Sequence, residues 1–147
     1  DGSPEVKARM RRLQMAASQK ASERAQAVDD VRDASVIITN PTHFAVALKY
    51  APEERDAPYI IAMGKGPMAT KIIDEGQKHN KSVVRSPLLA RALFFTGDIG
   101  LDVSEQLFSA VASVLAYVLQ IERGVEANLP DPELPNDLIY DEFGQKL

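Results

Sequence analysis

Two short apolar segments flank the tetrapeptide Asn40-Pro41-Thr42-His43 in this 147-residue chain. Residues 35–39 contain a β-branched run, and residues 44–50 alternate apolar side chains with small or charged ones, a pattern typical of strands. Proline is favoured at the second position of a tight turn, and asparagine at the first, because its side chain can bond the backbone two residues on. The sequence therefore predicts an antiparallel hairpin closed by a turn at residues 40–43.

The hairpin is expected to belong to a larger sheet. Residues 59–63 are predicted to form a third strand, and Val83 and Val84 supply a fourth. A helix that opens at Pro67 joins these two strands. Strands joined through a helix run parallel with a right-handed crossover, so we expect the third and fourth strands to share one direction.

Two further helices are predicted after the fourth strand. Ser86 is expected to cap the first of them, which begins at Pro87. The last helix is apolar on most sides over residues 107–121, and Asp102 with Glu105 resembles a capping box at its start. The predicted fold class is therefore α/β: a four-stranded mixed sheet packed with about three helices, preceded by an N-terminal helical arm.

Charge and composition divide the chain into three parts. Residues 1–33 are predicted to form a basic helical linker, because a thin apolar stripe accompanies six basic and two acidic residues between positions 5 and 28. Residues 34–124 are predicted to form the compact domain. Residues 125–147 carry six acidic residues, one lysine and three prolines, and are expected to be a flexible tail. The less favoured alternative is that apolar residues near its end dock on the domain or on a partner: Leu138, Ile139, Tyr140 and Phe143.

The residue types present exclude several kinds of site. The chain has no cysteine, which excludes disulfides, thiolate zinc sites, iron–sulfur clusters and cysteine nucleophiles. Its two histidines, His43 and His79, accompany neither an HExxH motif nor paired carboxylates at ligand spacing, so no metal site and no cofactor is predicted. No stretch reaches the roughly 18 apolar residues that span a bilayer. The chain begins at Asp1, and we expect it to be a fragment of a longer protein.

A net charge of −4 argues against nucleic acid as a partner, because phosphate binding depends on lysine and arginine. The basic arm is better explained as the positive flank of a membrane helix, since anionic lipid attracts such residues. A solvated helix face is the remaining alternative for the arm.

The turn residues carry a specific chemical possibility. Asparagine normally ages when the next backbone nitrogen attacks its side-chain carbonyl, but the nitrogen of Pro41 has no hydrogen, so this route is closed for Asn40. The other cyclisation stays open: the Asn40 side-chain nitrogen attacks the Asn40 main-chain carbonyl, forms a succinimide and expels the Pro41 nitrogen. This reaction breaks the chain. An ordinary uncleaved turn is the alternative.

The reaction needs assistance from the fold. A half-life of minutes corresponds to a barrier of about 21 kcal/mol. A strained turn lowers the barrier by roughly 1–3 kcal/mol, and one oriented donor to the developing oxyanion lowers it by roughly 3–4 kcal/mol. Together they are of the order of magnitude that the cyclisation needs. Thr42 and His43 are close enough in sequence to donate, to orient or to accept a proton. The sequence does not assign these roles.

The whole stretch TNPTHFAVALKY, residues 39–50, closely resembles the signature of the FlhB family of flagellar type III export switch proteins, with injectisome relatives such as YscU and SpaS. The likeness runs from residue 1 to about residue 124 and includes the basic arm and the last helix. It implies the cytoplasmic part of an inner-membrane protein that cleaves itself between Asn40 and Pro41, with Thr42 and His43 completing the loop. The two pieces stay together, and such a protein is a single-turnover autoprotease, not an enzyme with turnover.

The resemblance also implies a role and partners. The released turn permits the export gate to change from rod and hook subunits to filament subunits. The implied partners are other export-gate proteins, the hook-length control protein, exported flagellar subunits and, through the part that precedes this chain, the inner membrane.

A shallow groove for the short hydrophobic signal of an exported subunit is a further hypothesis from this resemblance. Ala57 and Pro58, with Ala112 and Leu115 on the last helix, are predicted to frame it, and core packing is the alternative for these residues. Two other functions remain open. One is an uncleaved adaptor that uses the same sheet as a binding surface, and the other is a multi-turnover hydrolase based on His43, which no nucleophile or base pair accompanies.

Overall fold

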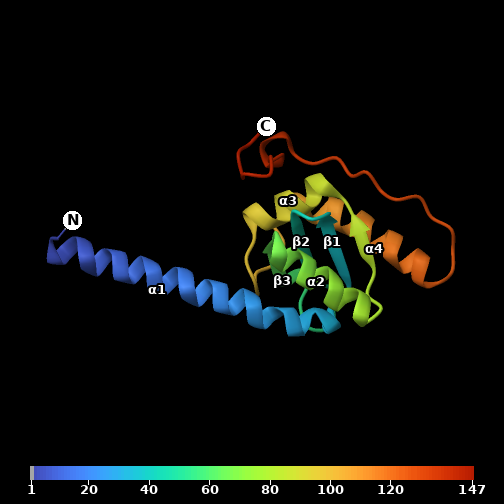
Figure 1. Cartoon of the computed structure of the whole chain (residues 1–147). Helices are drawn as coiled ribbons and strands as arrows, with labels where there is room; N and C mark the ends of the chain where they lie inside the picture. The colour runs from blue at the N-terminus through green and yellow to red at the C-terminus, as the bar shows by residue number, and fades with distance from the viewer. Residues whose placement is uncertain (1) are drawn as a thin grey trace.

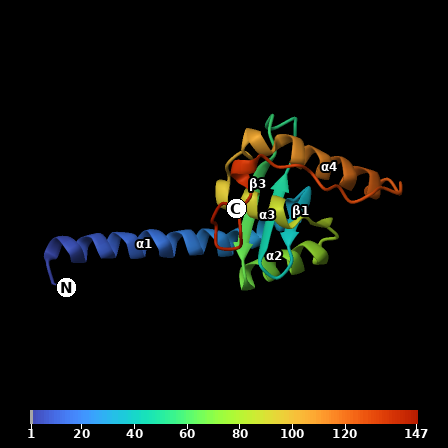
Figure 2. The same ribbon diagram turned by 90° about the horizontal axis from the view of Figure 1, so that it is seen from above.

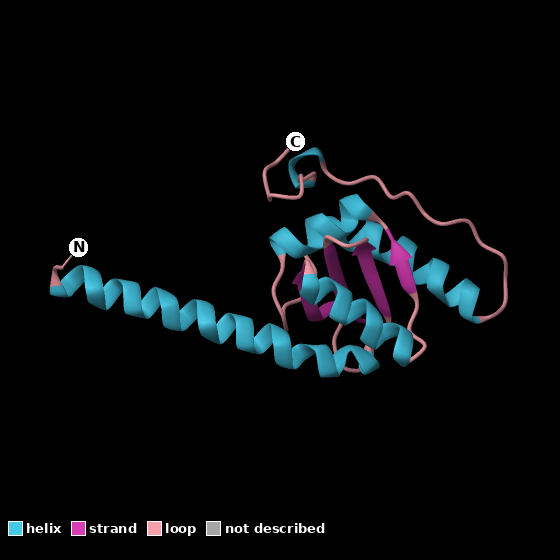
Figure 3. Ribbon diagram, viewed as in Figure 1, coloured by secondary structure: helices cyan, strands magenta, loops and turns pink. Residues whose placement is uncertain are grey.

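The computed structural model describes residues 2–147 (Figures 1 and 3). Its four-stranded sheet has the order β3-β2-β1-β4. The strands are β1 (Val36–Asn40), β2 (Phe44–Lys49), β3 (Tyr59–Lys65) and β4 (Val83–Arg85). β2 pairs antiparallel with both β1 and β3, whereas β4 pairs parallel with β1. The predicted hairpin and the mixed sheet are both confirmed.

The third and fourth strands share one direction, as the helix between them predicts. They do not neighbour each other, however, because β2 and β1 lie between them. The two hairpin strands take the centre of the sheet since nearly all of their residues are buried: Val36 to Thr39 in β1 and Phe44 to Leu48 in β2. Burial stabilises a strand with apolar side chains on both faces most when the strand lies at the centre of a sheet that is covered on both sides.

The described residues form four α-helices and three short 3₁₀ helices. The α-helices are α1 (Pro4–Ala27), α2 (Pro67–Lys78), α3 (Pro87–Thr96) and α4 (Phe108–Glu122), and the 3₁₀ helices are η1 (Val28–Asp33), η2 (Glu105–Leu107) and η3 (Asn136–Leu138). None of the helices in residues 2–147 combines the length and the apolar character that crossing a bilayer requires.

The helices cover both faces of the sheet (Figure 2). Side chains alternate along β1, so Val36 and Ile38 join the apolar cluster formed with α3 and α4, whereas Ile37 joins the cluster formed with α2. β2 alternates in the same way, with Phe44 on the first face and Ala45 on the second. The first residue after the turn therefore anchors the hairpin to α3.

The expected start of α3 at Pro87 is confirmed, whereas the expected capping contacts of α3 and α4 do not form. Ser86 stands at the N-cap of α3, but its side chain makes no capping hydrogen bond. The capping box does not form, because α4 begins only at Phe108, after η2. Asp102 instead pairs with Tyr59 as an isolated bridge and with the guanidinium of Arg55. Asp102 therefore contacts residues of β3 and of the loop before it instead of capping α4.

The arm α1 projects from the domain and contacts it only near its C-terminal end (Figures 1 and 2). Lys20 Nζ lies 3.3 Å from Asp98 Oδ2, and the Arg24 guanidinium lies 5.2 Å from the centre of the Phe94 ring. Burial raises the pKa of the Asp98 carboxyl, but the Ile99 N–H and Lys20 outweigh this effect and hold the pKa below its ordinary value. The carboxylate is therefore charged at neutral pH, and its stabilising contribution is lost only as the pH falls through the lowered pKa.

The end of the tail is packed on the domain, contrary to the disorder favoured above. The chain after α4 crosses back over α3 (Figure 1). Leu138 and Tyr140 are 6% and 8% exposed and belong to the same apolar cluster as α3 and α4, whereas Phe143 is 83% exposed. The aliphatic side chain of Leu138 and the aromatic side chain of Tyr140 therefore hold an otherwise acidic segment in place. The boundaries of the three predicted parts stay predictions.

Candidate functional site

Residues Asn40, Pro41, Thr42 and His43, called here the Asn-Pro turn, close the β1–β2 hairpin. The His43 N–H donates to the Asn40 carbonyl oxygen at 2.9 Å, which makes the four residues a hydrogen-bonded β-turn. Thr42, at the third position, has φ of 67°. Because the proline ring holds φ negative at the second position, a positive φ at the third identifies a type II turn.

Thr42 is the strained residue of the turn. The third position of a type II turn is usually glycine or asparagine, and a β-branched residue with positive φ is an outlier. Such a backbone costs on the order of 1–3 kcal/mol. The strands on either side hold it, because Asn40 pairs with Phe44 and the Gly66 N–H donates to the His43 carbonyl at 2.9 Å.

The hydrogen bond of the turn is directed at the carbonyl that the cyclisation would attack. The Asn40 oxygen accepts the His43 N–H, and the Asn40 carbon carries the bond to Pro41. A donor fixed at this oxygen stabilises negative charge that develops there during attack on the carbon. Strain at Thr42 and a donor from His43 are thus present together at one peptide bond.

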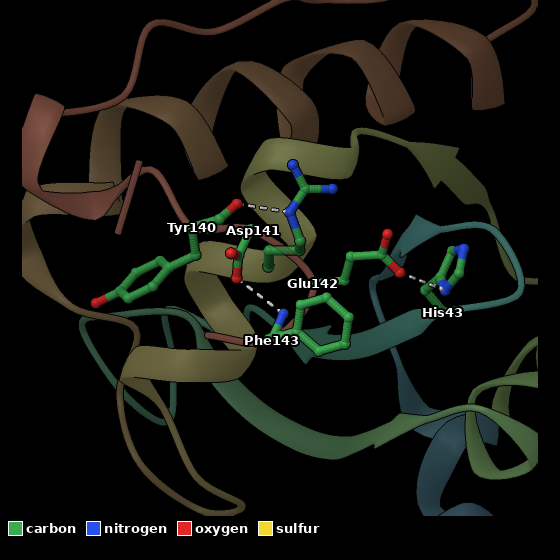
Figure 4. A network of polar contacts seen from close by, with 6 residues as sticks. His43, Tyr140, Asp141, Glu142 and Phe143 are labelled. Atoms are coloured by element: carbon green, nitrogen blue, oxygen red, sulfur yellow. Dashed lines mark hydrogen bonds and ion pairs between the residues drawn. The ribbon is translucent and has the colours of Figure 1, made fainter. Parts of the chain in front are cut away.

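The His43 side chain points toward the end of the tail (Figure 4). Its Nδ1 lies 3.2 Å from Glu142 Oε2, and both side chains are about half exposed. The contact is an ion pair when the imidazole is protonated, and a hydrogen bond when the neutral ring carries its proton on Nδ1. Nothing in the sequence predicts a contact between Glu142 and the turn, because the acidic, proline-containing tail has a composition typical of disorder.

An aromatic cluster lies beneath the turn. The Phe44 ring centre is 4.9 Å from that of Phe94 and 5.4 Å from that of Phe95. Phe95 in turn lies 5.5 Å from Tyr140 in the tail. Tilted and edge-on pairs at such separations add stability beyond the burial of their area. Nothing in the sequence predicts this cluster, since the pairing of the rings depends on how α3 crosses the sheet.

The four residues of the predicted groove lie on two parts of the fold, the loop before β3 and helix α4. Ala57 and Pro58 lie half-buried in the loop before β3, where the Pro58 carbonyl accepts the Val103 N–H at 2.9 Å. Ala112 is exposed on α4. Leu115 lines a surface depression of about 470 Å³ together with residues of other elements, among them Ser35, Tyr50 and Lys81. The groove stays a prediction.

His79 stands at the C-cap of α2. Its Nε2 lies 3.0 Å from Glu75 Oε2 on the same helix. Within residues 2–147, His, Asp and Glu side chains form no group of three or more that is placed to hold a metal ion.

Both the sequence and the fold match those of one protein family. The sequence model of the FlhB HrpN YscU SpaS Family matches residues 1–118. The chain is 40% identical to the flagellar biosynthetic protein FlhB of Salmonella typhimurium over 138 residues, which are 94% of this chain and 35% of that protein. It is also 40% identical to the FlhB of Aquifex aeolicus over 127 residues, covering 86% of this chain and 35% of the relative. The chain thus spans about a third of the length of these relatives.

Two solved structures share the fold. The cytoplasmic domain of FlhB from Shewanella putrefaciens superimposes with a TM-score of 0.74 at 36% identity, and the match covers 80% of this chain and 95% of that one. A mutated EscU C-terminal domain gives a TM-score of 0.61 at 28% identity, covering 63% of this chain and 92% of that one. The mixed sheet with its surrounding helices is therefore the architecture of this family.

Proposed function

Because the chain belongs to the FlhB HrpN YscU SpaS family, we propose that it is the cytoplasmic domain of a flagellar type III export-gate protein that cleaves itself between Asn40 and Pro41. The observation that carries the proposal is the strained type II turn, in which the His43 N–H donates to the carbonyl oxygen of Asn40. The carbon of this carbonyl forms the bond that would be broken. The cleavage and the export role are both proposals from this geometry and from the family.

The cleavage proceeds within Asn40. Its side-chain nitrogen attacks its own main-chain carbonyl carbon, and the oxygen that gains negative charge accepts the His43 N–H. The carbon–nitrogen bond to Pro41 then breaks, and the proton lost by the side-chain amide goes to the Pro41 nitrogen. One fragment ends in a succinimide at residue 40, and the other begins with the secondary amine of Pro41. Release of the Thr42 backbone from its strained conformation favours the forward direction.

The two fragments remain associated after cleavage. The N-terminal fragment contributes β1, which lies between β2 and β4 of the C-terminal fragment. Val36, Ile37 and Ile38 of this strand are all completely buried. One broken peptide bond in an exposed turn leaves these contacts unchanged, so cleavage alters the surface of the domain and keeps its core.

The altered surface is proposed to switch the substrate specificity of the export gate from rod and hook subunits to filament subunits. The partners in this proposal are other export-gate proteins, the hook-length control protein and exported flagellar subunits. The protein would lie at the cytoplasmic face of the inner membrane. The exposed basic side chains of α1 support this placement, since they suit a surface of anionic lipid.

The direct test of self-cleavage is the mass of the freshly purified and aged chain under denaturing conditions. We expect the 147-residue mass to be replaced by two fragments that separate between residues 40 and 41, the larger beginning at Pro41. A chain that remains unbroken through ageing and warming would overturn self-cleavage. In that case the uncleaved adaptor is the better description of the domain.

A Thr42→Gly substitution is expected to slow cleavage by roughly 5- to 160-fold, because glycine adopts the positive φ without the roughly 1–3 kcal/mol of strain. The rate constant is measured from the mass of the intact chain over time. Thr42→Ala is the matched control, since alanine keeps most of the backbone strain and removes the hydroxyl. Equally slow cleavage in the alanine and glycine variants would assign the role to the hydroxyl instead, because neither side chain carries one.

A further inference from the structure

The C-terminal segment, residues 136–147, lies on a surface formed by α3 and the Asn-Pro turn (Figure 4). Arg91 Nε on α3 donates to the Tyr140 carbonyl at 2.7 Å. The Tyr140 ring packs on Phe95, and Gly144 approaches the same phenylalanine so closely that a Cβ there would lie 2.8 Å from its ring. The segment is thus seated by one charged hydrogen bond and by aromatic packing.

The segment forms a small loop of its own before it reaches the turn. The Asp141 carboxylate accepts the N–H groups of Phe143 and Gln145, each at 2.9 Å. The Leu147 N–H donates to the Ile139 carbonyl at 2.8 Å, which closes the loop. Glu142 stands at the tip of this loop and faces His43.

The turn and the segment are connected by two independent sets of contacts. The first is the direct contact of 3.2 Å between His43 Nδ1 and Glu142 Oε2. The second runs through aromatic rings, because Phe44, which follows the turn directly, contacts Phe95, and Phe95 contacts Tyr140. A shift of the turn that moved His43 and Phe44 would therefore change both sets of contacts.

We propose that the surface of α3 and the Asn-Pro turn is a docking site for the C-terminal segment of this same chain, and that docking depends on the closed state of the turn. The segment meets this surface through the Tyr140 carbonyl, which accepts from Arg91, and through the Glu142 carboxylate, which lies 3.2 Å from His43 Nδ1. Opening of the turn removes the bond from the His43 N–H to the Asn40 oxygen, frees His43 from its position opposite Glu142 and releases the segment.

The coupling acts in both directions. If the closed turn strengthens docking of the segment, then the docked segment strengthens the closed turn by the same factor. The proposal rests on the proposed self-cleavage only for the event that opens the turn in the cell. The coupling itself is a property of the intact chain and is tested there.

Amide hydrogen exchange followed by NMR tests the coupling in the full chain, kept intact by Asn40→Ala. We expect protection of the Asp141 and Leu147 amides, which donate within the loop of the segment. Tyr140→Ala removes the packing of the segment on Phe95 and is expected to lower this protection by about tenfold or more. The same variant is expected to shift the backbone resonances of Thr42 and His43.

The contact between His43 and Glu142 is tested by a double-mutant cycle. Glu142→Gln and His43→Ala are each expected to lower the protection of the segment by roughly 1.5- to 5-fold, as suits a half-exposed pair, and the double variant by no more than either alone. Phe143→Ser is the matched control, because this side chain belongs to the same loop and is 83% exposed. It is expected to leave both the segment and the turn unchanged.

Two results would overturn the proposal. One is exchange of the segment amides at the rate of a free peptide in the Asn40→Ala chain. The other is a Tyr140→Ala variant in which the segment loses protection while the Thr42 and His43 resonances stay where they were. Neither result bears on self-cleavage, which is read separately from the mass of the chain with Asn40 present.

Discussion

Replacing Asn40 by alanine is expected to leave the chain as a single polypeptide for as long as it is incubated. Alanine has no side-chain nitrogen, so the only nucleophile that the proposed cyclisation uses is removed. The backbone of residue 40 still pairs with Phe44 and still accepts the His43 N–H, and neither contact uses the Asn40 side chain. The fold is therefore expected to survive, and the measurement is intact mass under denaturing conditions together with a thermal melt.

Asn40→Asp is the matched control for this variant. The aspartate side chain has nearly the same shape as asparagine and accepts hydrogen bonds, but it carries oxygen where asparagine carries the attacking nitrogen. Both variants are expected to stay intact near neutral pH. Cleavage of either one between residues 40 and 41 at the rate of the unaltered chain would contradict asparagine cyclisation.

Phe44→Ala is expected to lower the free energy of unfolding by about 3–5 kcal/mol, the usual cost of truncating a buried phenylalanine. Phe44 is 2% exposed, follows the Asn-Pro turn and contacts both Phe94 and Phe95. Its removal leaves a cavity between β2 and α3 that the neighbouring strands cannot fill without moving. Denaturant unfolding in the Asn40→Ala background measures the loss, because an uncleaved chain permits a two-state treatment.

Phe143→Ala provides the comparison for Phe44→Ala. The same atoms are removed from a side chain that is 83% exposed, so the expected change is within about 0.5 kcal/mol. If Phe44→Ala does not fold, Phe44→Leu keeps much of the buried volume and is expected to lose a smaller amount, about 1–2 kcal/mol. Equal effects at positions 44 and 143 would contradict the role of the aromatic cluster beneath the turn.

Prediction from the sequence succeeded where neighbours along the chain decide the structure. The hairpin and its turn follow from strand alternation and from proline at the second turn position, and both were confirmed. The helices after β3 and β4 were also expected. The predicted capping box at Asp102 and Glu105 is wrong, since Asp102 pairs instead with Arg55 in a distant loop and with Tyr59 of β3.

Part of the candidate site was predicted as well, because residues that neighbour each other along the chain form it. The four turn residues are consecutive, so their grouping follows from the sequence alone. The positive φ of Thr42 was not predicted, because nothing in a threonine side chain favours it. The closing strands and the Gly66 hydrogen bond impose this conformation, and they belong to the packed sheet.

The covalent order of Asn40 and Pro41 by itself determined which cyclisation is chemically open, since a proline nitrogen without hydrogen needs no fold to block the other route. Only the tertiary structure decided that β4 lies beside β1, that Thr42 holds a positive φ, and that Glu142 reaches His43. Each of these features depends on contacts between segments that are distant in the sequence. Such contacts depend on how side chains fill a shared volume, and local sequence patterns do not encode that volume.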